Sequence, residues 1–280
     1  KDSTKRNHLS TLMLLQEFKK NITFSDLTFE LISSFEYFLQ LKGYHTNTIA
    51  KHMKHLKRHV NIAINKEYIE IQKYAFRKYK IKTIENKHTH LVPEELERLE
   101  NLILSDRYVK LQKSLDAFLF CCYAGMRYSD FINLSSENIV DINQETWLIY
   151  KSVKTGTEVR LPLYLLFSGK GITILNKYKD NLEDFFHLRD NSNINKDLII
   201  ITRLAGLSKR ISFHTARHTN ATLLIYNGIN ITTVQKLLGH KSVKTTQIYT
   251  NVMDMTIIHD LEKMKQAIPI AGKKVDNSFK

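Results

Sequence analysis

The sequence predicts a protein that is mainly α-helical, carries one small antiparallel β-sheet and is divided into two domains. The chain has 280 residues, which is more than one average domain and within the range of two. Its 42% of hydrophobic residues, with only 9 glycines and 3 prolines, suit buried cores built mainly from helices. Helical periodicity is clear over residues 46–66, whereas strand-like runs are confined to residues 138–163.

Residues 1–84 are expected to form a helical domain. Within residues 46–66, apolar side chains recur at steps of three and four and so share one stripe of a helix: Ile49, Met53, Leu56, Val60 and Ala63. An earlier helix over residues 27–41 ends near Gly43, a residue type that often follows a helix C-terminus. Away from the stripe lie side chains that either bind the phosphates of a nucleic acid or simply face solvent: Lys51, Lys54, His55, Lys57 and Arg58.

A linker is expected between the domains. Residues 74–90 are polar, rich in cations and without apolar periodicity, and the boundary is assigned to residues 85–92. A helix should begin at Pro93, because proline is favoured in the first turn and the acids Glu94 and Glu95 complement the helix dipole. The second domain is therefore assigned to residues 93–269, followed by a loose tail over residues 270–280.

Within the second domain, a helix over residues 108–124 contains an unbroken apolar run and should be buried, with Gly125 at its end. Residues 138–141, 146–153 and 158–163 read as short strands, the last two joined by a turn at Thr155 and Gly156. Helices resume after Phe213, with Gly228 and Gly239 as stops. The result is a small sheet inside a helical domain.

Composition narrows the class of protein. The formal net charge is +14, and residues 1–90 hold 17 Lys and Arg against 8 Asp and Glu, so a polyanionic partner is favoured. No run of eighteen apolar residues and no hydrophobic secretory segment occur, which predicts a soluble cytoplasmic protein without a membrane partner. Cys121 and Cys122 are neighbours in an apolar run, which fits reduced, buried thiols. No Cys and His spacing predicts a metal site.

The second domain also holds residues suited to phosphoryl transfer, which needs cations, hydrogen-bond donors, a nucleophile and a proton donor around one phosphorus. Arg127 follows the helix stop at Gly125. Arg217 lies three residues after His214, so that Arg217 and His214 share a face if both are helical. Singly, each candidate has an ordinary structural explanation. Arg127 could pair with Asp130, and the remaining candidates could be a core histidine, a helix cap and a half-buried aromatic: His214, His240 and Tyr249.

Four segments together resemble, in order and spacing, the tyrosine recombinase (phage integrase) family. They are Ala124-Gly125-Met126-Arg127-Tyr128-Ser129-Asp130, His214-Thr215-Ala216-Arg217-His218, Leu238-Gly239-His240 and Thr245-Thr246-Gln247-Ile248-Tyr249. The phrase Thr48-Ile49-Ala50-Lys51-His52-Met53 also resembles the core-binding domain of that family. The likeness covers most of the chain and is nearest to the integrases of conjugative transposons. Val92 and Asn251 depart from residues that many relatives have there, Thr and His respectively.

The resemblance implies a role for each matched residue. Arg127 and Arg217 would clamp the scissile phosphate, with His214 and His240 as hydrogen-bonding or acid–base groups and Tyr249 as the nucleophile that forms a 3′-phosphotyrosine. Lys154 best matches the lysine that protonates the leaving oxygen, with Lys151 on the same hairpin as the alternative, and Asp130 would orient its neighbours. The chemistry would need neither ATP, nor a metal, nor another cofactor.

The family further implies two domains closed around double-stranded DNA and a homotetramer acting on paired DNA sites through a Holliday junction. Segments such as residues 257–270 would pack between neighbouring subunits, and host or element-encoded DNA-bending factors would assist integration or excision of a mobile element at the nucleoid. Two alternatives stay open. One is a type IB topoisomerase, which shares the tyrosine chemistry, and the other is a non-catalytic DNA-binding accessory protein.

Overall fold

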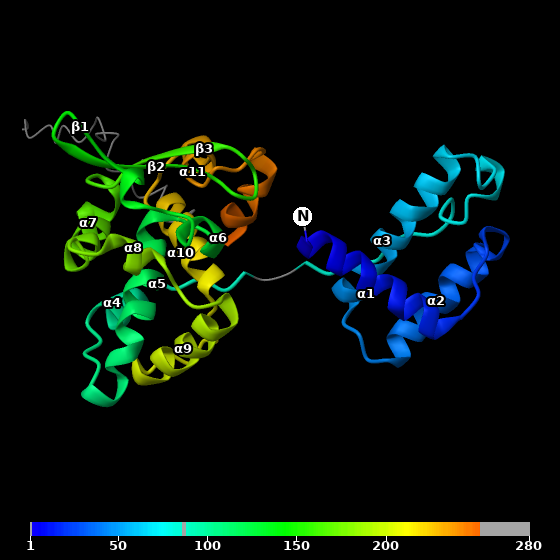
Figure 1. The fold of residues 1–280 in the computed structure, drawn as a ribbon, viewed down its shortest axis with the longest axis horizontal. Helices are drawn as coiled ribbons and strands as arrows, with labels where there is room; N and C mark the ends of the chain where they lie inside the picture. The colour runs from blue at the N-terminus through cyan, green and yellow to red at the C-terminus, as the bar shows by residue number, and fades with distance from the viewer. Residues whose placement is uncertain (1, 86–87, 253–280) are drawn as a thin grey trace, which may run out of the picture. The chain divides into compact units, whose positions relative to one another are not determined.

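The structure is a computed structural model that describes residues 2–85 and 88–252. The chain divides into two compact units, Lys1–Lys87 and His88–Lys280 (Figure 1). They are called unit 1 and unit 2 below. The expected tail over residues 270–280 and the segment 257–270 lie outside the described residues.

Unit 1 is built on three helices, α1 (Asp2–Phe18), α2 (Phe29–Leu41) and α3 (Thr46–Asn65). The hydroxyl of Thr28 caps α2 by accepting the backbone N–H of Leu31, and Gly43 follows the helix with φ of 76°. Every residue of the apolar stripe predicted on α3 is buried, and the stripe packs with apolar residues of α2. The helical prediction for residues 46–66 is thus confirmed.

Residues 74–84 lack apolar periodicity and resemble a linker, although they fall inside the expected domain over residues 1–84; in the structure they pack onto unit 1. Ala75 and Phe76 are buried in its core, and the hydroxyl of Tyr79 donates to Glu36 Oε2 at 2.6 Å. The side chain of Asn47 holds the backbone of residue 84 through two hydrogen bonds of 2.8 and 2.9 Å. The linker prediction is wrong for this stretch, because a few aromatic anchors fix an irregular segment whose intervening cations face solvent.

Unit 2 has a helical core that runs through α5 and α10, which pack against each other in the middle of the unit (Figure 1). Residues 114–124 of α5 are all buried. The helix begins at Gln112, four residues later than the sequence predicts, because Asp106–Leu111 forms a 3₁₀ helix. The α-helices that the structure describes in this unit are α4 (Pro93–Glu100), α5 (Gln112–Ala124), α6 (Tyr128–Phe131), α7 (Lys170–Lys177), α8 (Leu182–Phe186), α9 (Asn191–Leu204), α10 (Phe213–Tyr226) and α11 (Ile231–Leu237).

The predicted sheet is present as three antiparallel strands in the order β1 (Ile139–Ile142), β2 (Glu145–Lys151) and β3 (Glu158–Pro162). Leu148 lies opposite Leu161, and both are fully buried against the helices. Tyr150 and its partner Val159 are buried on the same face. The sheet therefore covers the helical core on one side and carries the β2–β3 turn to its rim.

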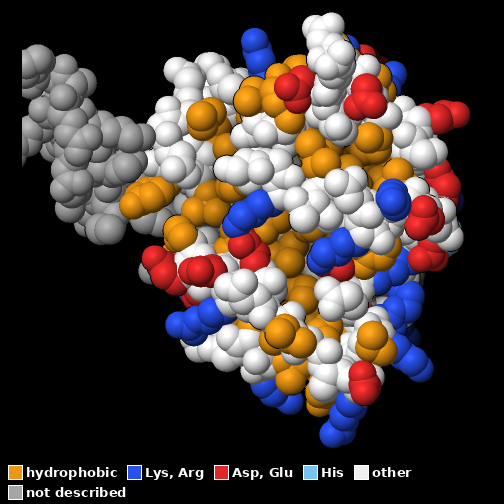
Figure 2. All heavy atoms as spheres, turned by 90° about the vertical axis from the view of Figure 1, so that its left-hand side faces the viewer, with side chains coloured by type: hydrophobic (Ala, Val, Ile, Leu, Met, Phe, Trp, Pro, Cys, Tyr) orange, Lys and Arg blue, Asp and Glu red, His pale blue; other side chains and the backbone are white. Residues whose placement is uncertain are grey.

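Residues 170–204, where no helix is predicted, contain α7, α8 and α9. Asp190 caps α9 by accepting the backbone N–H groups of Ser192 and Asn193. The face of unit 2 shown in Figure 2, on the left-hand side of Figure 1, has Lys and Arg interspersed with Asp and Glu around hydrophobic side chains. The described residues visible on this face therefore carry charges of both signs. Among the helices that the structure describes, none is long and apolar enough to span a membrane.

Candidate active site

Gly125 ends α5 and turns the chain toward Arg127. Its φ of 65° is left-handed, and a Cβ there would lie 2.6 Å from Asn220 Oδ1 and 2.8 Å from Leu238 Cδ2. Only glycine fits this position without displacing its neighbours. The amide of Asn220 donates to the carbonyls of Cys122 and Tyr123 at 2.9 Å each, which fastens α10 to the end of α5.

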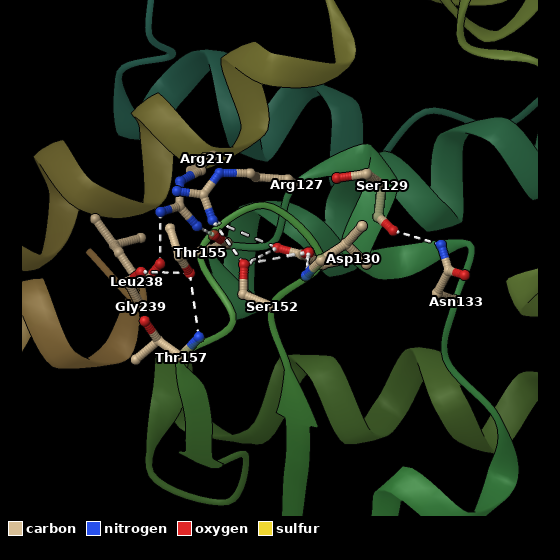
Figure 3. A network of polar contacts seen from close by, with 12 residues as sticks. Arg127, Ser129, Asp130, Asn133, Ser152, Thr155, Thr157, Arg217, Leu238 and Gly239 are labelled. Carbon is tan, nitrogen blue, oxygen red and sulfur yellow. Dashed lines mark hydrogen bonds and ion pairs between the residues drawn. The ribbon is translucent and has the colours of Figure 1, made fainter. Parts of the chain in front are cut away.

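Arg127 stands at the start of α6 in a network with Asp130 and Ser152 (Figure 3). Its Nη1 lies 3.5 Å from Asp130 Oδ2 and 3.3 Å from Ser152 Oγ. The carboxylate of Asp130 is fully buried and also accepts the backbone N–H of Val153 at 2.9 Å. The local ion pair considered for Arg127 therefore exists, and it joins the guanidinium to the β2–β3 turn.

Arg217 on α10 is only 1% exposed, yet the ends of two other helices receive its hydrogen bonds. Its Nη1 donates to the carbonyl of Gly125 at 2.7 Å, and its Nη2 donates to the carbonyl of Leu238 at 2.5 Å. Carbonyls at helix ends lack partners within the helix, so the guanidinium satisfies both. Burial and the nearby charge of Arg127 lower the pKa of Arg217 to about 10. Figure 3 shows the two guanidinium groups beside each other, an arrangement that an anion would stabilise.

Two of the predicted histidines border the arginines. His214, in the first turn of α10, is exposed, so the buried-core alternative for it is wrong. His240 is buried, its Nδ1 lies 2.9 Å from Thr246 Oγ1, and its backbone N–H donates to Gln235 to close α11. His240 therefore caps α11 through its backbone N–H, as the alternative proposed, but its imidazole ring is not part of the cap.

Both imidazoles are neutral near pH 7. Partial burial of the ring, followed by the charges of Arg217 and Arg127, lowers the pKa of His214 to about 4. The same causes in the same order lower the pKa of His240 to about 3. Each neutral ring carries one lone pair and one N–H, and the N–H can donate to a phosphate oxygen.

Lys154 lies in the exposed turn between β2 and β3. Its charge helps lower the pKa of His214 and of His240, so its ammonium is within electrostatic reach of both rings. The hydroxyl of Thr155 donates to the carbonyl of Gly239 at 3.2 Å and ties this turn to the end of α11. Lys151 is exposed at the end of β2, opposite Glu158.

Tyr249 belongs to a 3₁₀ helix, Gln247–Val252, and is 4% exposed. Its hydroxyl lies 3.1 Å from Nδ1 of His218. Burial raises the pKa of Tyr249, while the charges of Arg217 and Arg127 and a hydrogen bond from Arg217 act against this rise. The phenol and both guanidinium groups therefore lie close together in a single chain, and this cluster of side chains is called the pocket.

Two residues of this pocket carry no assigned role in the sequence analysis. His218 contacts the Tyr249 hydroxyl, and its spacing of four residues from His214 was the available signal for a shared helix face. Tyr150 is buried. In the part of the chain that the structure describes, its hydroxyl is a buried polar atom without a hydrogen-bond partner. Burial and the charge of Asp130 raise the pKa of Tyr150, whereas Arg217 and Arg127 act in the opposite direction.

The predicted nucleic-acid contacts of unit 1 lie on α3 in different surroundings. Lys54 and Arg58 are exposed, while Lys51 is half-buried. His55 packs toward α1, with Nδ1 2.9 Å from Thr11 Oγ1, and Lys57 Nζ lies 5.9 Å from the ring centre of Phe76. In the part of the chain that the structure describes, no cluster of three or more His, Cys, Asp or Glu side chains could hold a metal ion.

Fold and pocket together define a tyrosine recombinase of the phage integrase type. The chain belongs to the phage integrase family: the pattern described as "Phage integrase family" matches residues 89–255, and "Phage integrase SAM-like domain" matches residues 1–81. The family resemblance and the fold class predicted from the sequence are thereby confirmed.

Known relatives are tyrosine recombinases. The chain is 26% identical over 274 residues to tyrosine recombinase XerD of Oceanobacillus iheyensis, covering 89% of the chain and 86% of the relative. It is 29% identical over 181 residues to a tyrosine recombinase of Pseudothermotoga lettingae, covering 63% of the chain and 60% of that relative. The match thus spans less than two thirds of the Pseudothermotoga protein.

Solved structures share the fold. A lambda integrase dimer bound to a COC′ core site superposes with a TM-score of 0.72 at 20% identity, covering 89% of this chain and 88% of that one. The Tn1549 transposon integrase in complex with circular intermediate DNA gives a TM-score of 0.72 at 16% identity, with 94% of each chain covered. At these identities the likeness establishes the fold alone.

Proposed function

We propose that this protein is a site-specific DNA recombinase that integrates or excises a mobile element by cleaving and rejoining DNA through a 3′-phosphotyrosine. One observation carries the proposal: the buried phenol of Tyr249 lies beside the guanidinium of Arg217, which hydrogen-bonds to it, and the charge of Arg127 acts on both. A nucleophile next to two cations suits a phosphodiester, whose transition state gathers negative charge on its non-bridging oxygens.

In this mechanism Arg127 and Arg217 bind the non-bridging oxygens of the scissile phosphate. His214 and His240 are neutral near pH 7 and donate further hydrogen bonds to the same group. The Tyr249 oxygen attacks phosphorus, the bond to the 5′ oxygen breaks, and the phosphotyrosine conserves the bond energy for rejoining. No ATP and no metal are needed in this proposal.

The leaving 5′ oxygen takes its proton from Lys154. Support for Lys154 over Lys151 comes from electrostatics, because the charge of Lys154 acts on both pocket histidines. Asp130 acts indirectly: it contacts Arg127 and the backbone at Val153, so that it orients both the guanidinium and the turn that carries the lysine.

The substrate in this proposal is double-stranded DNA, held by both domains mainly through its phosphates. The basic surface of α3 would contribute Lys54 and Arg58, which are exposed. Homotetramers on paired sites are proposed by analogy, since similar solved structures include a lambda integrase tetramer bound to a Holliday junction. DNA-bending helper proteins and action at the nucleoid, in the cytoplasm, belong to the same proposal.

A nicked suicide substrate that loses its 5′ hydroxyl fragment tests the proposal. The wild type should form a protein–DNA adduct that resists denaturant, whereas Tyr249→Phe should bind the same DNA and form none. Recombination between two specific sites would support a recombinase. Relaxation of any supercoiled plasmid by a monomer would point to a type IB topoisomerase, and DNA binding without any adduct would point to a non-catalytic accessory protein.

A further inference from the structure

Three histidine rings lie together on one side of the pocket, and one of them contacts the hydroxyl of Tyr249. The nearest is His218, which is 8% exposed and has its Nδ1 3.1 Å from that hydroxyl. The rings of His214 and His88 each lie 4.6 Å from the ring of His218, centre to centre. His218 is therefore the imidazole in hydrogen-bond contact with the expected nucleophile, whereas His214 stands one helical turn earlier and is exposed.

The contact between His218 and Tyr249 can carry the phenol proton toward the imidazole. Burial raises the pKa of Tyr249, so its phenol keeps its proton near pH 7 and can donate it. The guanidinium of Arg217 can only donate, so it donates to the phenol oxygen. In the tautomer of His218 that carries its proton on Nε2, Nδ1 accepts the phenol proton.

We propose that His218 is the base that receives the proton of Tyr249 during strand cleavage and returns it during rejoining, which rests on the function proposed above. As the phenol oxygen bonds to phosphorus and the bond from phosphorus to the 5′ oxygen breaks, the phenol proton moves to Nδ1. His218 becomes an imidazolium, and the 5′ oxygen takes a separate proton from Lys154. In rejoining, the 5′ hydroxyl returns its proton to the lysine and the imidazolium reprotonates the released phenolate.

The surroundings of His218 make this base sensitive to DNA. Burial first, and then His214, His88, Arg217 and His90, lower the pKa of His218 to about 3, so the ring is neutral and its lone pair is available. His214 and Arg217 lie on its own helix, while His88 and His90 come from the segment before α4. A DNA phosphate bound to Arg217 would offset the cationic charge and raise the pKa of His218, strengthening the base only when substrate is present.

Two substitutions separate proton transfer from mere positioning. His218→Asn places an amide oxygen near the position of Nδ1, so it can still accept a hydrogen bond but cannot take the proton. His187→Asn is the matched control, because His187 is exposed at the end of α8. Cleavage is measured in single turnover, with enzyme in excess, on a suicide substrate with an ordinary 5′ oxygen and on one with a bridging 5′ sulfur, which leaves without a proton.

We expect His218→Asn to cleave about 10²–10⁴-fold more slowly on both substrates, the usual range for loss of a general base. The rate of this variant should rise with pH as phenolate forms without help. Lys154→Ala should be slow on the oxygen substrate and recover on the sulfur substrate, and His187→Asn should match the wild type.

A cleavage rate of His218→Asn within about threefold of the wild type would overturn the assignment. A wild-type rate of this variant on the sulfur substrate, with a slow rate on the oxygen substrate, would also overturn it, because His218 would then act on the leaving oxygen. Urea unfolding checks that the variant is folded. Should His218→Asn not fold, His218→Gln is judged by the same rates. Failure of the proposed function has a different signature, since the wild type itself would then give no adduct.

Discussion

Asp130 offers a stringent test of how the pocket is held together. Its carboxylate is fully buried, contacts Arg127 at 3.5 Å and accepts the backbone N–H of Val153 at 2.9 Å. Asp130→Asn keeps the size and one acceptor oxygen but removes the negative charge. The change leaves the guanidinium of Arg127, which is 12% exposed, without its ion-pair partner.

Removing one partner of a buried ion pair costs about 3–5 kcal/mol in the free energy of unfolding. Because asparagine can still accept the Val153 N–H, we expect the lower end, about 3 kcal/mol. For a domain of this size that corresponds to a fall of roughly 6–12 °C in Tm. The rate of DNA cleavage should fall even at temperatures where the variant is folded, because the turn that carries Lys154 loses its anchor.

Urea and thermal unfolding measure the first effect, and single-turnover cleavage at a temperature where the variant is folded measures the second. Asp141→Asn is the matched control: Asp141 is exposed on β1, so its change should stay within about 0.5 kcal/mol of the wild type. An Asp130→Asn variant as stable and as active as Asp141→Asn would refute the view that Asp130 holds Arg127 and the turn.

Three further predictions follow from the pocket and from the proposed DNA contacts. Gly125→Ala should lower the free energy of unfolding by about 1–2 kcal/mol from the left-handed backbone alone, and by more from the clash with Leu238; urea unfolding at the wild-type value would contradict this. Stability should fall as pH drops below the unfolded histidine pKa of about 6.5, because the unfolded chain binds protons that His240, with a folded pKa of about 3, does not. Between pH 7 and pH 5 the free energy of unfolding of His240→Gln should fall by about 2 kcal/mol less than that of the wild type, as measured by urea unfolding at each pH. An equal fall in the two proteins would contradict the burial of a neutral His240 ring. With about 6–10 phosphate contacts, DNA affinity should drop by on the order of 10³–10⁵ between ~50 and ~200 mM salt in a binding titration, and a shallow slope would exclude a clamp of that kind.

Much of the fold could be predicted from the sequence where periodicity and helix stops agree. The stripe on α3, the start of α4 at Pro93 and the three strands were predictable because each has a local signal. The packing of residues 74–84 was not, since a few aromatic anchors stabilise an irregular segment that looks like a linker when only charge is counted.

Helix α9 shows a signal that was present and unused. Ile194, Leu198 and Ile201 are buried at helical spacing, and Asp190 stands at the N-cap. By contrast, the pairing of Arg217 with the carbonyls of Gly125 and Leu238 has no local signature, because it joins residues far apart in the chain.

Predictability differs in the same way across the candidate site. Motif order predicted the site residues as a set, and in the structure Arg127, Arg217 and Tyr249 lie close together within one chain. The contact of His218 with Tyr249 depends on how the last 3₁₀ helix folds back against α10, which is a tertiary property. The family resemblance implies an acid–base role for His214, the exposed member of the pair, and assigns none to His218.

The most direct measurement is the identity of the amino acid that becomes covalently linked to DNA. Trypsin cleavage after Lys244 and Lys263 yields a peptide over residues 245–263 in which Tyr249 is the only tyrosine. Mass spectrometry of the trapped adduct should find the nucleotide on this peptide and on that residue. A nucleotide on any other residue, or on no residue of a protein that still recombines DNA, would contradict the central claim.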